Sequence, residues 1–322
     1  MKKSLVVLFL IVGAAAYAQP YQIAVIPKGT SNDYWKVVHA GALKAVQELK
    51  GEGVEVNLLW EGPATEDLVD RQQQIVREMT AKHVSGIAIS PGDVRALVAP
   101  VEAAVQAGIP VVVIDSGLQS VKQLSFVATD NYKGGVLGAR RLGTVLEGKG
   151  KVILYRSRKG AAGTEARETG FLDAMKNQYP GIQVISSDQY AGGTYESAEK
   201  NATELLKRLG QEATGVFASN ETAAIGMLVA LRTEGLAKKI KFVGFDASPR
   251  TLEALKSGEM QGFVVQDPIK MGYLGVKLLI DHLKGRSVER EVDTGCVMVT
   301  LDNLEKPAIA DLVNPPVDKY LK

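Results

Sequence analysis

The amino-acid sequence predicts an α/β fold of two similar, doubly wound (Rossmann-like) lobes with parallel sheets, joined by a three-strand hinge. Three observations lead to this prediction. Unbroken apolar runs alternate with helical stretches, the whole alternating series occurs twice, and the segments that follow each copy lead back toward the other copy. Apolar runs without polar alternation are typical of strands buried on both faces, as in a parallel sheet covered by helices.

Residues 1–18 precede the first strand-like run and have the three parts of a secretory signal peptide. Two lysines provide the charge, an apolar stretch follows, and the tripeptide "AYA" offers a cleavage site of small residues. The apolar stretch is shorter than the roughly 20 residues that a membrane-spanning helix needs. The sequence therefore predicts cleavage after Ala18 and a periplasmic protein without stable membrane insertion; a membrane anchor is the competing interpretation.

The first copy of the series runs from residue 21 to residue 115. Strands are expected in "YQIAVIP", "VEVNLLW", "SGIAISP" and "IPVVVID". The helices between them are predicted from apolar residues at helix-face spacing. In the first helix these residues are Val38, Ala42, Val46 and Leu49.

The second copy repeats the series with strands expected in "GKVILYRS", "IQVISSD", "TGVFASN" and "IKFVGFD" and with helices between them. Matching landmarks keep a nearly constant separation. It is 129 positions from Gly41 to Gly170 and from Ser85 to Thr214, and 131 from Ile109 to Ile240. A period this long is too large for a solenoid repeat and indicates two similar domains.

The segments outside the two copies predict where the chain passes between the lobes. We expect crossings near 129–130, 266–267 and 293–296. Three parallel connections allow the lobes to bend toward each other while restricting twist. The predicted lobes are residues 19–129 plus 267–294 and residues 130–266 plus 295–322.

Composition and motifs exclude several classes of function. Without residues 1–18, 36 basic residues would face 36 acidic ones, which argues against a nucleic-acid partner. The single Cys296 permits no internal disulfide, and His39, His83 and His282 are scattered without metal-ligand spacing. Neither a P-loop nor a dinucleotide-binding pattern occurs. We therefore expect no metal and no cofactor.

Polar side chains accumulate where the predicted strands end. Ligands of open parallel α/β sheets bind beyond the carboxyl ends of the strands, so we expect these side chains to form the site. Gln266 lies at a predicted crossing, within reach of both lobes. The predicted ligand-binding residues are Lys28, Asn32, Tyr34, Trp35, Ser90, Asp115, Ser116, Arg167, Asn220, Asp246 and Gln266.

The chemistry of these side chains suits a polyhydroxylated ligand. Carboxylates, carboxamides and cations make directional bonds to hydroxyls, and an Asp or Arg can contact two neighbouring oxygens at once. Tyr34 and Trp35 offer flat apolar faces that match the C–H faces of a sugar ring. Other interpretations remain open at this stage. Asp115, Asp246 and Asn32 could cap helices instead, and Lys28 could point into solvent.

Several motifs resemble those of the ribose-binding-like branch of periplasmic sugar-binding proteins, the type I solute receptors of ABC transporters. They are "SNDYW", "IPVVVIDS", "ARETGF", "VFASNETAAIG", "VGFDAS" and "VVQDP". The resemblance covers nearly all of the chain after residue 18. It implies a non-catalytic receptor that closes around a monosaccharide or related polyol and delivers it to a membrane permease. We expect such a receptor to be a monomer.

This sequence departs from the resemblance at three positions. Ser116 stands where an arginine is common, Lys28 replaces a small polar residue, and Gly193 replaces an aromatic residue. The lysine makes a larger, oxidised or otherwise modified sugar as plausible as ribose. A receptor that signals to a chemoreceptor or sensor kinase is the main alternative function. A sugar-responsive transcription regulator and a hydrolase using Asp115 and Asp246 are further alternatives.

Overall fold

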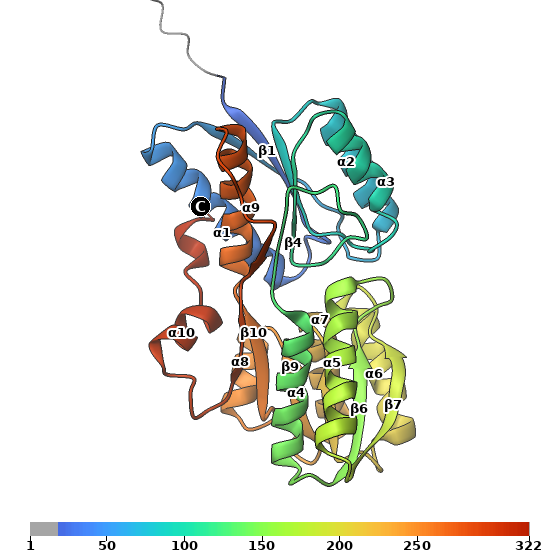
Figure 1. Cartoon of the computed structure of the whole chain (residues 1–322). Coiled ribbons are helices and arrows are strands. Elements are labelled where there is room, and N and C mark those ends of the chain that lie inside the picture. Colours follow the sequence, from blue (N-terminus) through green and yellow to red (C-terminus); the bar gives the residue numbers. More distant parts are fainter. Residues whose placement is uncertain (1–18, 322) are drawn as a thin grey trace, which may run out of the picture.

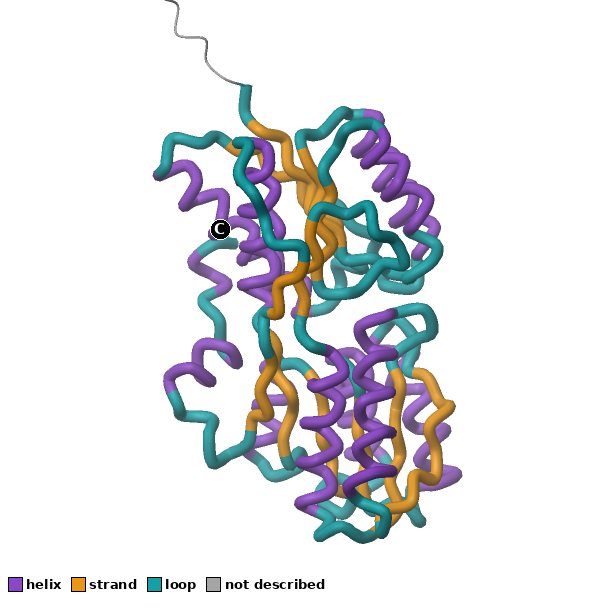
Figure 2. Tube along the Cα trace, viewed as in Figure 1, coloured by secondary structure: helices purple, strands orange, loops and turns teal. Residues whose placement is uncertain are grey.

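The computed structural model describes residues 19–321 and contains two six-stranded sheets, each covered by helices on both faces (Figure 1). The sheets lie in separate lobes, one above the other in Figure 2. Nine of the ten strand pairings in these two sheets are parallel. The predicted α/β fold of two similar lobes is therefore confirmed. The predicted signal peptide lies outside the described residues.

The first sheet has the strand order β11-β5-β4-β3-β1-β2. Its strands are β1 (Tyr21–Ile26), β2 (Val56–Trp60), β3 (Gly86–Ile89), β4 (Val111–Ile114), β5 (Ser125–Ala128) and β11 (Glu291–Asp293). One face is covered by α1 (Asp33–Gly51) and α9 (Pro268–Leu283), and the other by α2 (Val69–Ala81) and α3 (Val98–Gln106).

The second sheet repeats this arrangement with the order β12-β10-β9-β8-β6-β7. Its strands are β6 (Gly150–Arg156), β7 (Ile182–Tyr190), β8 (Gly215–Ala218), β9 (Lys241–Phe245), β10 (Gly262–Gln266) and β12 (Cys296–Val299). The helices α4 (Asn131–Val145) and α5 (Ala162–Gln178) cover one face. The other face is covered by α6 (Tyr195–Leu209), α7 (Glu221–Thr233) and α8 (Pro249–Lys256).

The apolar strands are buried because each sheet separates two hydrophobic cores. In β1, Ile23 and Val25 pack toward α1 and α9, whereas Ala24 and Ile26 pack toward α2 and α3. Successive side chains of a strand point to opposite faces, so both sets must be apolar. This is the physical reason for the unbroken apolar runs of the sequence.

The chain passes between the two sheets after β5, after β10 and after β11. The first and third passages are joined, since the Thr129 hydroxyl donates to the Gly295 carbonyl at 3.0 Å. Only Thr294 and Gly295 separate β11 from β12. The chain leaves one sheet at its carboxyl edge and enters the other at the facing carboxyl edge. As a result β12 runs antiparallel to β10, although β11 runs parallel to β5.

The last residues of the chain depart from the predicted lobes. The helix α10 (Pro307–Val313) packs against β10 of the second lobe, but the short 3₁₀ segment η1 (Val317–Lys319) packs against α1 of the first. Figure 1 shows the C-terminus beside α1. Pro315 and Pro316 cannot extend α10, and the chain leaves it toward the other lobe. Assigning all of residues 295–322 to the second lobe was therefore wrong at its end.

Candidate ligand-binding site

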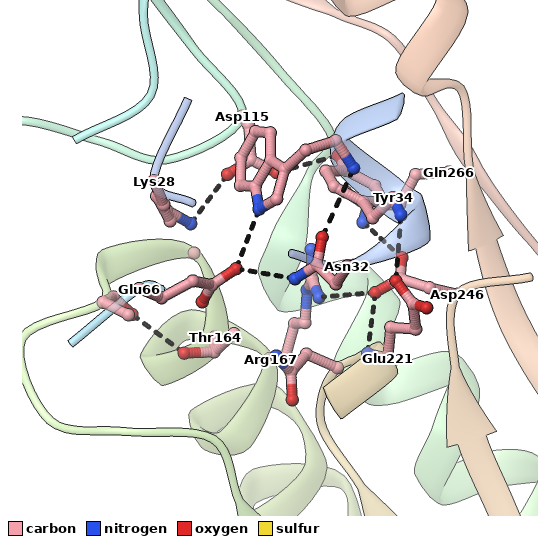
Figure 3. Close-up of a pocket in the computed structure, with 14 residues that line it drawn as sticks. Lys28, Asn32, Tyr34, Glu66, Asp115, Thr164, Arg167, Glu221, Asp246 and Gln266 are labelled. Carbon is pink, nitrogen blue, oxygen red and sulfur yellow. Dashed lines mark hydrogen bonds and ion pairs between the residues drawn. The ribbon is translucent and has the colours of Figure 1, made fainter. Parts of the chain in front are cut away.

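A cavity lies between the carboxyl ends of the two sheets, and its volume in this structure is about 30 Å³. Figure 3 shows the side chains that line it. Nine predicted site residues are among them: Lys28, Asn32, Tyr34, Trp35, Asp115, Arg167, Asn220, Asp246 and Gln266.

Asp115 is the centre of the first-lobe wall. It follows β4, and its carboxylate accepts hydrogen bonds from Lys28 Nζ at 2.7 Å, the Tyr34 hydroxyl at 2.8 Å and Ser90 Oγ at 2.8 Å. Burial by itself would raise the pKa of Asp115. The charges of Lys28 and Arg167 and the hydrogen bonds outweigh burial, so the pKa of this carboxyl is lowered. Asp115 is thus an ionised carboxylate held by three side chains of its own lobe.

Asp246 holds the corresponding place in the second lobe, after β9. Its carboxylate accepts from Gln266 Nε2 at 2.6 Å and from the Glu221 backbone N–H at 3.1 Å. The nearest cation is Nη1 of Arg167, at 3.8 Å. Burial raises the pKa of Asp246, and the Arg167 charge offsets only part of that effect. Neither aspartate caps the helix that follows it, so the capping interpretation was wrong for both.

Both aspartates have left-handed backbone conformations, with φ of 61° at Asp115 and 69° at Asp246. This region is uncommon for residues other than glycine, and aspartate is one of the few that tolerate it. Such conformations persist at functional sites where the surrounding structure holds them. The same local geometry at the ends of β4 and β9 brings two equivalent carboxylates to one cavity.

Arg167 is positioned by close packing of α5 against α4. A Cβ atom at Gly135 would lie 1.8 Å from the Arg167 carbonyl oxygen, so only glycine allows this approach. The guanidinium then donates to Asn131 Oδ1 at 2.7 Å and to the Ser219 carbonyl at 3.0 Å, and it stacks on Phe245. These three partners all belong to the second lobe, so the arginine is held in place without a ligand.

Asn32 and Asn220 are helix caps as well as cavity-lining residues. Asn32 Oδ1 accepts from the Trp35 N–H at 3.4 Å, and Asn220 Oδ1 accepts from the Ala223 N–H at 3.0 Å. Both residues line the cavity, and the amide nitrogen of Asn32 donates to Glu66 Oε1 at 3.1 Å. For Asn32 the two interpretations of the sequence are therefore compatible, because one side chain does both.

Ser90 and Ser116, in contrast, do not line the cavity, and both are fully buried behind its wall. Ser90 donates to Asp115, as noted above. Ser116 Oγ accepts from the Gly163 N–H at 3.1 Å. The prediction that they contact the ligand is corrected on this geometry. Both serines follow strands at the carboxyl edge of the sheet, but their short side chains are already hydrogen-bonded to other groups of the protein.

Five lining residues were not predicted, and two of them, Glu66 and Glu221, are acidic; the others are Ala161, Gly163 and Thr164. Glu66 Oε1 accepts from Trp35 Nε1 at 2.9 Å and from Asn32. Glu221 accepts the Tyr195 hydroxyl at 2.7 Å, and burial is the main reason that its pKa rises to about 7. Glu66 lies in the loop after β2. Ligands bind beyond the carboxyl ends of the strands, so a search that extended through this whole loop would have included Glu66. Glu221 begins α7, where an acidic residue is ordinarily interpreted as a complement to the helix dipole.

The lobes are in direct contact around the cavity. Hydrogen bonds that cross between them include Tyr34 N–H to Glu221 Oε2 (3.0 Å), Gly193 N–H to Asp67 Oδ2 (2.9 Å), Gly163 N–H to Ser116 Oγ (3.1 Å), Val94 N–H to the Gly160 carbonyl (2.9 Å) and the Arg158 guanidinium to the Gly92 carbonyl. The cavity is consequently enclosed by both halves of the molecule, which is a closed arrangement.

Comparison with known proteins gives the class that this fold and site define. Residues 23–287 match the family described as "Periplasmic binding protein domain", and the chain belongs to this family. Its members are solute-binding proteins and not enzymes. Among residues 19–321, no helix combines the length and apolar character needed to cross a membrane.

Individual relatives agree with this assignment. The chain is 30% identical to the D-allose-binding periplasmic protein of Escherichia coli, over 87% of this chain and 89% of the relative. It is also similar to a carbohydrate transporter solute-binding protein from Agrobacterium radiobacter, solved with D-arabinose. The identity is 39% and the TM-score 0.85, over 92% of this chain and 99% of that one. A solute-binding protein from Agrobacterium vitis with bound D-fucose has 32% identity and a TM-score of 0.86, over 91% and 99% of the two chains.

Proposed function

We propose that this protein is a periplasmic receptor that captures a monosaccharide or related polyol between its lobes and delivers it to an ABC import permease. The observation that carries the proposal is the pair of equivalent carboxylates, Asp115 and Asp246, facing one enclosed cavity from opposite lobes. A ligand there touches both walls only when the lobes are together. Ligand binding therefore favours the closed state by the contacts that the open state lacks.

The cavity chemistry supports a polyhydroxylated ligand. Asp115, Asp246 and Gln266 accept hydrogen bonds from hydroxyls, while Lys28 and Arg167 donate to hydroxyl or ring oxygens. The Tyr34 and Trp35 rings meet edge to face, with centroids 5.0 Å apart, and add apolar surface to the same wall. Hydrogen bonds to charged groups contribute about 1.5–3 kcal/mol each, so several of them account for micromolar or tighter binding.

The relatives support the ligand class. Their bound or named ligands are D-arabinose, D-fucose and D-allose, all neutral monosaccharides. Membership in a family of periplasmic binding proteins favours secretion through the signal peptide proposed for residues 1–18. In this function the protein acts as a monomer, and its closed lobes together form the surface that the permease recognises.

A thermal-shift screen over pentoses, hexoses and polyols tests the proposal. A ligand at 100 times its dissociation constant stabilises the native state by about 2.7 kcal/mol, enough for a clear rise in melting temperature. Small-angle scattering with and without that ligand should show compaction as the lobes close. If no neutral sugar or polyol raises the melting temperature, the proposed function fails.

A further inference from the structure

The cavity wall carries more carboxylates than cations. Its carboxylates are Asp115, Asp246, Glu66 and Glu221, and its cations are Lys28 and Arg167. Each cation lies within ion-pair distance of an aspartate, at 2.7 Å for Lys28 and Asp115 and at 3.8 Å for Arg167 and Asp246. Within residues 19–321, neither glutamate has an ion-pair partner. The charge of both lysine and arginine is thus already matched by the protein.

Two acceptor atoms on this wall have no donor among the described residues. Both bonds to Glu66 converge on Oε1, and no hydrogen bond reaches Oε2. The second atom is Oε1 of Gln266, which is buried and unpartnered, since the amide nitrogen of that residue is committed to Asp246. Gln266 Oε1 is fully buried, and a buried acceptor is costly when it lacks a donor, whereas Glu66 Oε2 keeps some accessible surface. We therefore expect the ligand to present hydrogen-bond donors to this wall.

We propose that Glu66 is a specificity-determining residue that excludes sugars carrying an acidic group, so that the receptor takes neutral or amine-bearing sugars. This inference rests on the proposed function and narrows its ligand class. Figure 3 shows the Glu66 carboxylate pointing into the cavity, opposite the Arg167–Asp246 pair. Glu66 is 8% exposed, so little water screens its charge from an enclosed ligand. A hydroxyl or ammonium group donates to its free oxygen, whereas a ligand carboxylate is repelled.

Glu66 is better suited to this role than Glu221. Both oxygens of Glu221 are used by the protein, one by the Tyr195 hydroxyl and one by the Tyr34 N–H. In Glu66, Oε1 accepts two hydrogen bonds from the protein and Oε2 accepts none. It is held by Trp35, a residue of the aromatic wall, so its position relative to a bound ring is fixed.

The same geometry argues against the acidic ligand that Lys28 suggested in the sequence. The Lys28 ammonium donates to Asp115 and lies 5.7 Å from the centre of the Trp35 ring. An anion placed beside it would meet the Asp115 carboxylate as well. The lysine therefore holds Asp115 in its ionised, hydroxyl-binding form and supplies no uncompensated positive charge.

Matched sugars test the inference on the unmodified protein. The probes are sets that share a ring and differ in one group: glucose, glucosamine and glucuronate, and galactose, galactosamine and galacturonate, beside the best neutral ligand of the screen. We expect the acid of each set to bind at least about tenfold more weakly than its neutral counterpart. An acid that binds as tightly as its neutral counterpart overturns the inference but leaves sugar binding intact. If no probe binds at all, the proposed function fails, and the inference with it.

The variant Glu66→Gln tests the residue itself. Its amide oxygen can still accept from Asn32 and Trp35, so the wall keeps its shape, while the negative charge is lost. We expect the neutral-to-acid affinity ratio to fall by about tenfold, and affinity for the neutral ligand to fall less. The control is Glu61→Gln, which removes an exposed carboxylate from the same loop and should leave the ratio unchanged. If Glu66→Gln folds with an unchanged ratio, Glu66 is not the determinant. If it does not fold, the acid-to-neutral comparison on the unmodified protein decides.

Discussion

The backbone N–H of Tyr34, in the first turn of α1, donates to Oε2 of Glu221, in the first turn of α7, across the boundary between the lobes at 3.0 Å. The other oxygen of Glu221 accepts from Tyr195 of the second lobe. One buried carboxylate thereby joins an aromatic residue of the ligand wall to the opposite lobe. We therefore expect the protonation of Glu221 to be coupled to closure of the lobes.

Ligand affinity should fall as the pH rises toward neutrality. The pKa of Glu221 is about 7 in the closed form, mainly because of burial, with the Asp246 and Asp33 charges acting in the same direction. Opening removes the Tyr34 N–H and the first-lobe cover from this carboxyl, so we expect its pKa to fall toward the ordinary value of 4.5. Between these two pH values the closed form binds more protons than the open form. Closure therefore becomes less favourable as the pH rises, and its free energy changes little above about pH 7.

Titration calorimetry at pH 5.5 and 7.5 should therefore give about tenfold weaker binding at the higher pH. The pKa of Asp246 is also raised, so the measurement that isolates Glu221 is the difference between the unmodified protein and Glu221→Gln. Glu221→Gln should lose most of the pH dependence of ligand affinity. The exposed Glu196→Gln should keep it. Equal pH dependence in all three proteins would contradict the coupling.

Gly193→Ala should weaken ligand binding without unfolding the protein. A Cβ atom there would lie 2.4 Å from Asp67 Oδ2, and its three nearest atoms all belong to Asp67 of the other lobe, so the methyl group opposes closure. We expect a loss of affinity of about tenfold or more, since closure contacts contribute directly to binding. Isothermal titration measures it, with circular dichroism as the check on folding.

Gly51→Ala is the matched control, because a Cβ atom there meets nothing within 4 Å. Combining Gly193→Ala with Asp67→Gly removes the obstacle and should restore part of the affinity. A double variant as weak as Gly193→Ala alone would mean that the methyl group acts through something other than this contact.

Asp115→Ala should cost stability even without ligand. It leaves the Lys28 ammonium buried and unpaired, and breaking a buried pair in this way costs about 3–5 kcal/mol. Chemical denaturation of the ligand-free protein measures the free energy of unfolding. The double variant Lys28→Met with Asp115→Ala should recover much of the loss, while sugar binding stays absent. If the single and double variants are equally unstable, the pair is not the source of the cost.

Asp246→Ala should abolish the thermal response to sugar with a smaller cost in stability. Its nearest cation, Arg167, keeps hydrogen bonds to Asn131 and Ser219 and its stacking on Phe245. The arginine is therefore still held when the carboxylate is removed. The measurement is the melting temperature with and without the best ligand of the screen. A full ligand-induced rise in this variant would remove Asp246 from the proposed site.

The sequence by itself determined the repeated α/β architecture and most of the cavity wall. Apolar runs identify strands buried on both faces, because each sheet must fill two cores, and polar residues directly after such strands reach the ligand edge. Asp115 and Asp246 were found in this way, as were Tyr34 and Trp35. These features depend on local periodicity and on a rule of sheet topology, both of which can be inferred from a single chain.

Only the tertiary structure decided which polar groups are already used by the protein. The pairing of Lys28 with Asp115, the withdrawal of Ser90 and Ser116 behind the wall, and the free oxygen of Glu66 all depend on partners far away in the sequence. The contact of η1 with α1 is of the same kind. A side chain's chemical type can be read from the sequence, but its remaining hydrogen-bonding capacity depends on which neighbours folding brings to it.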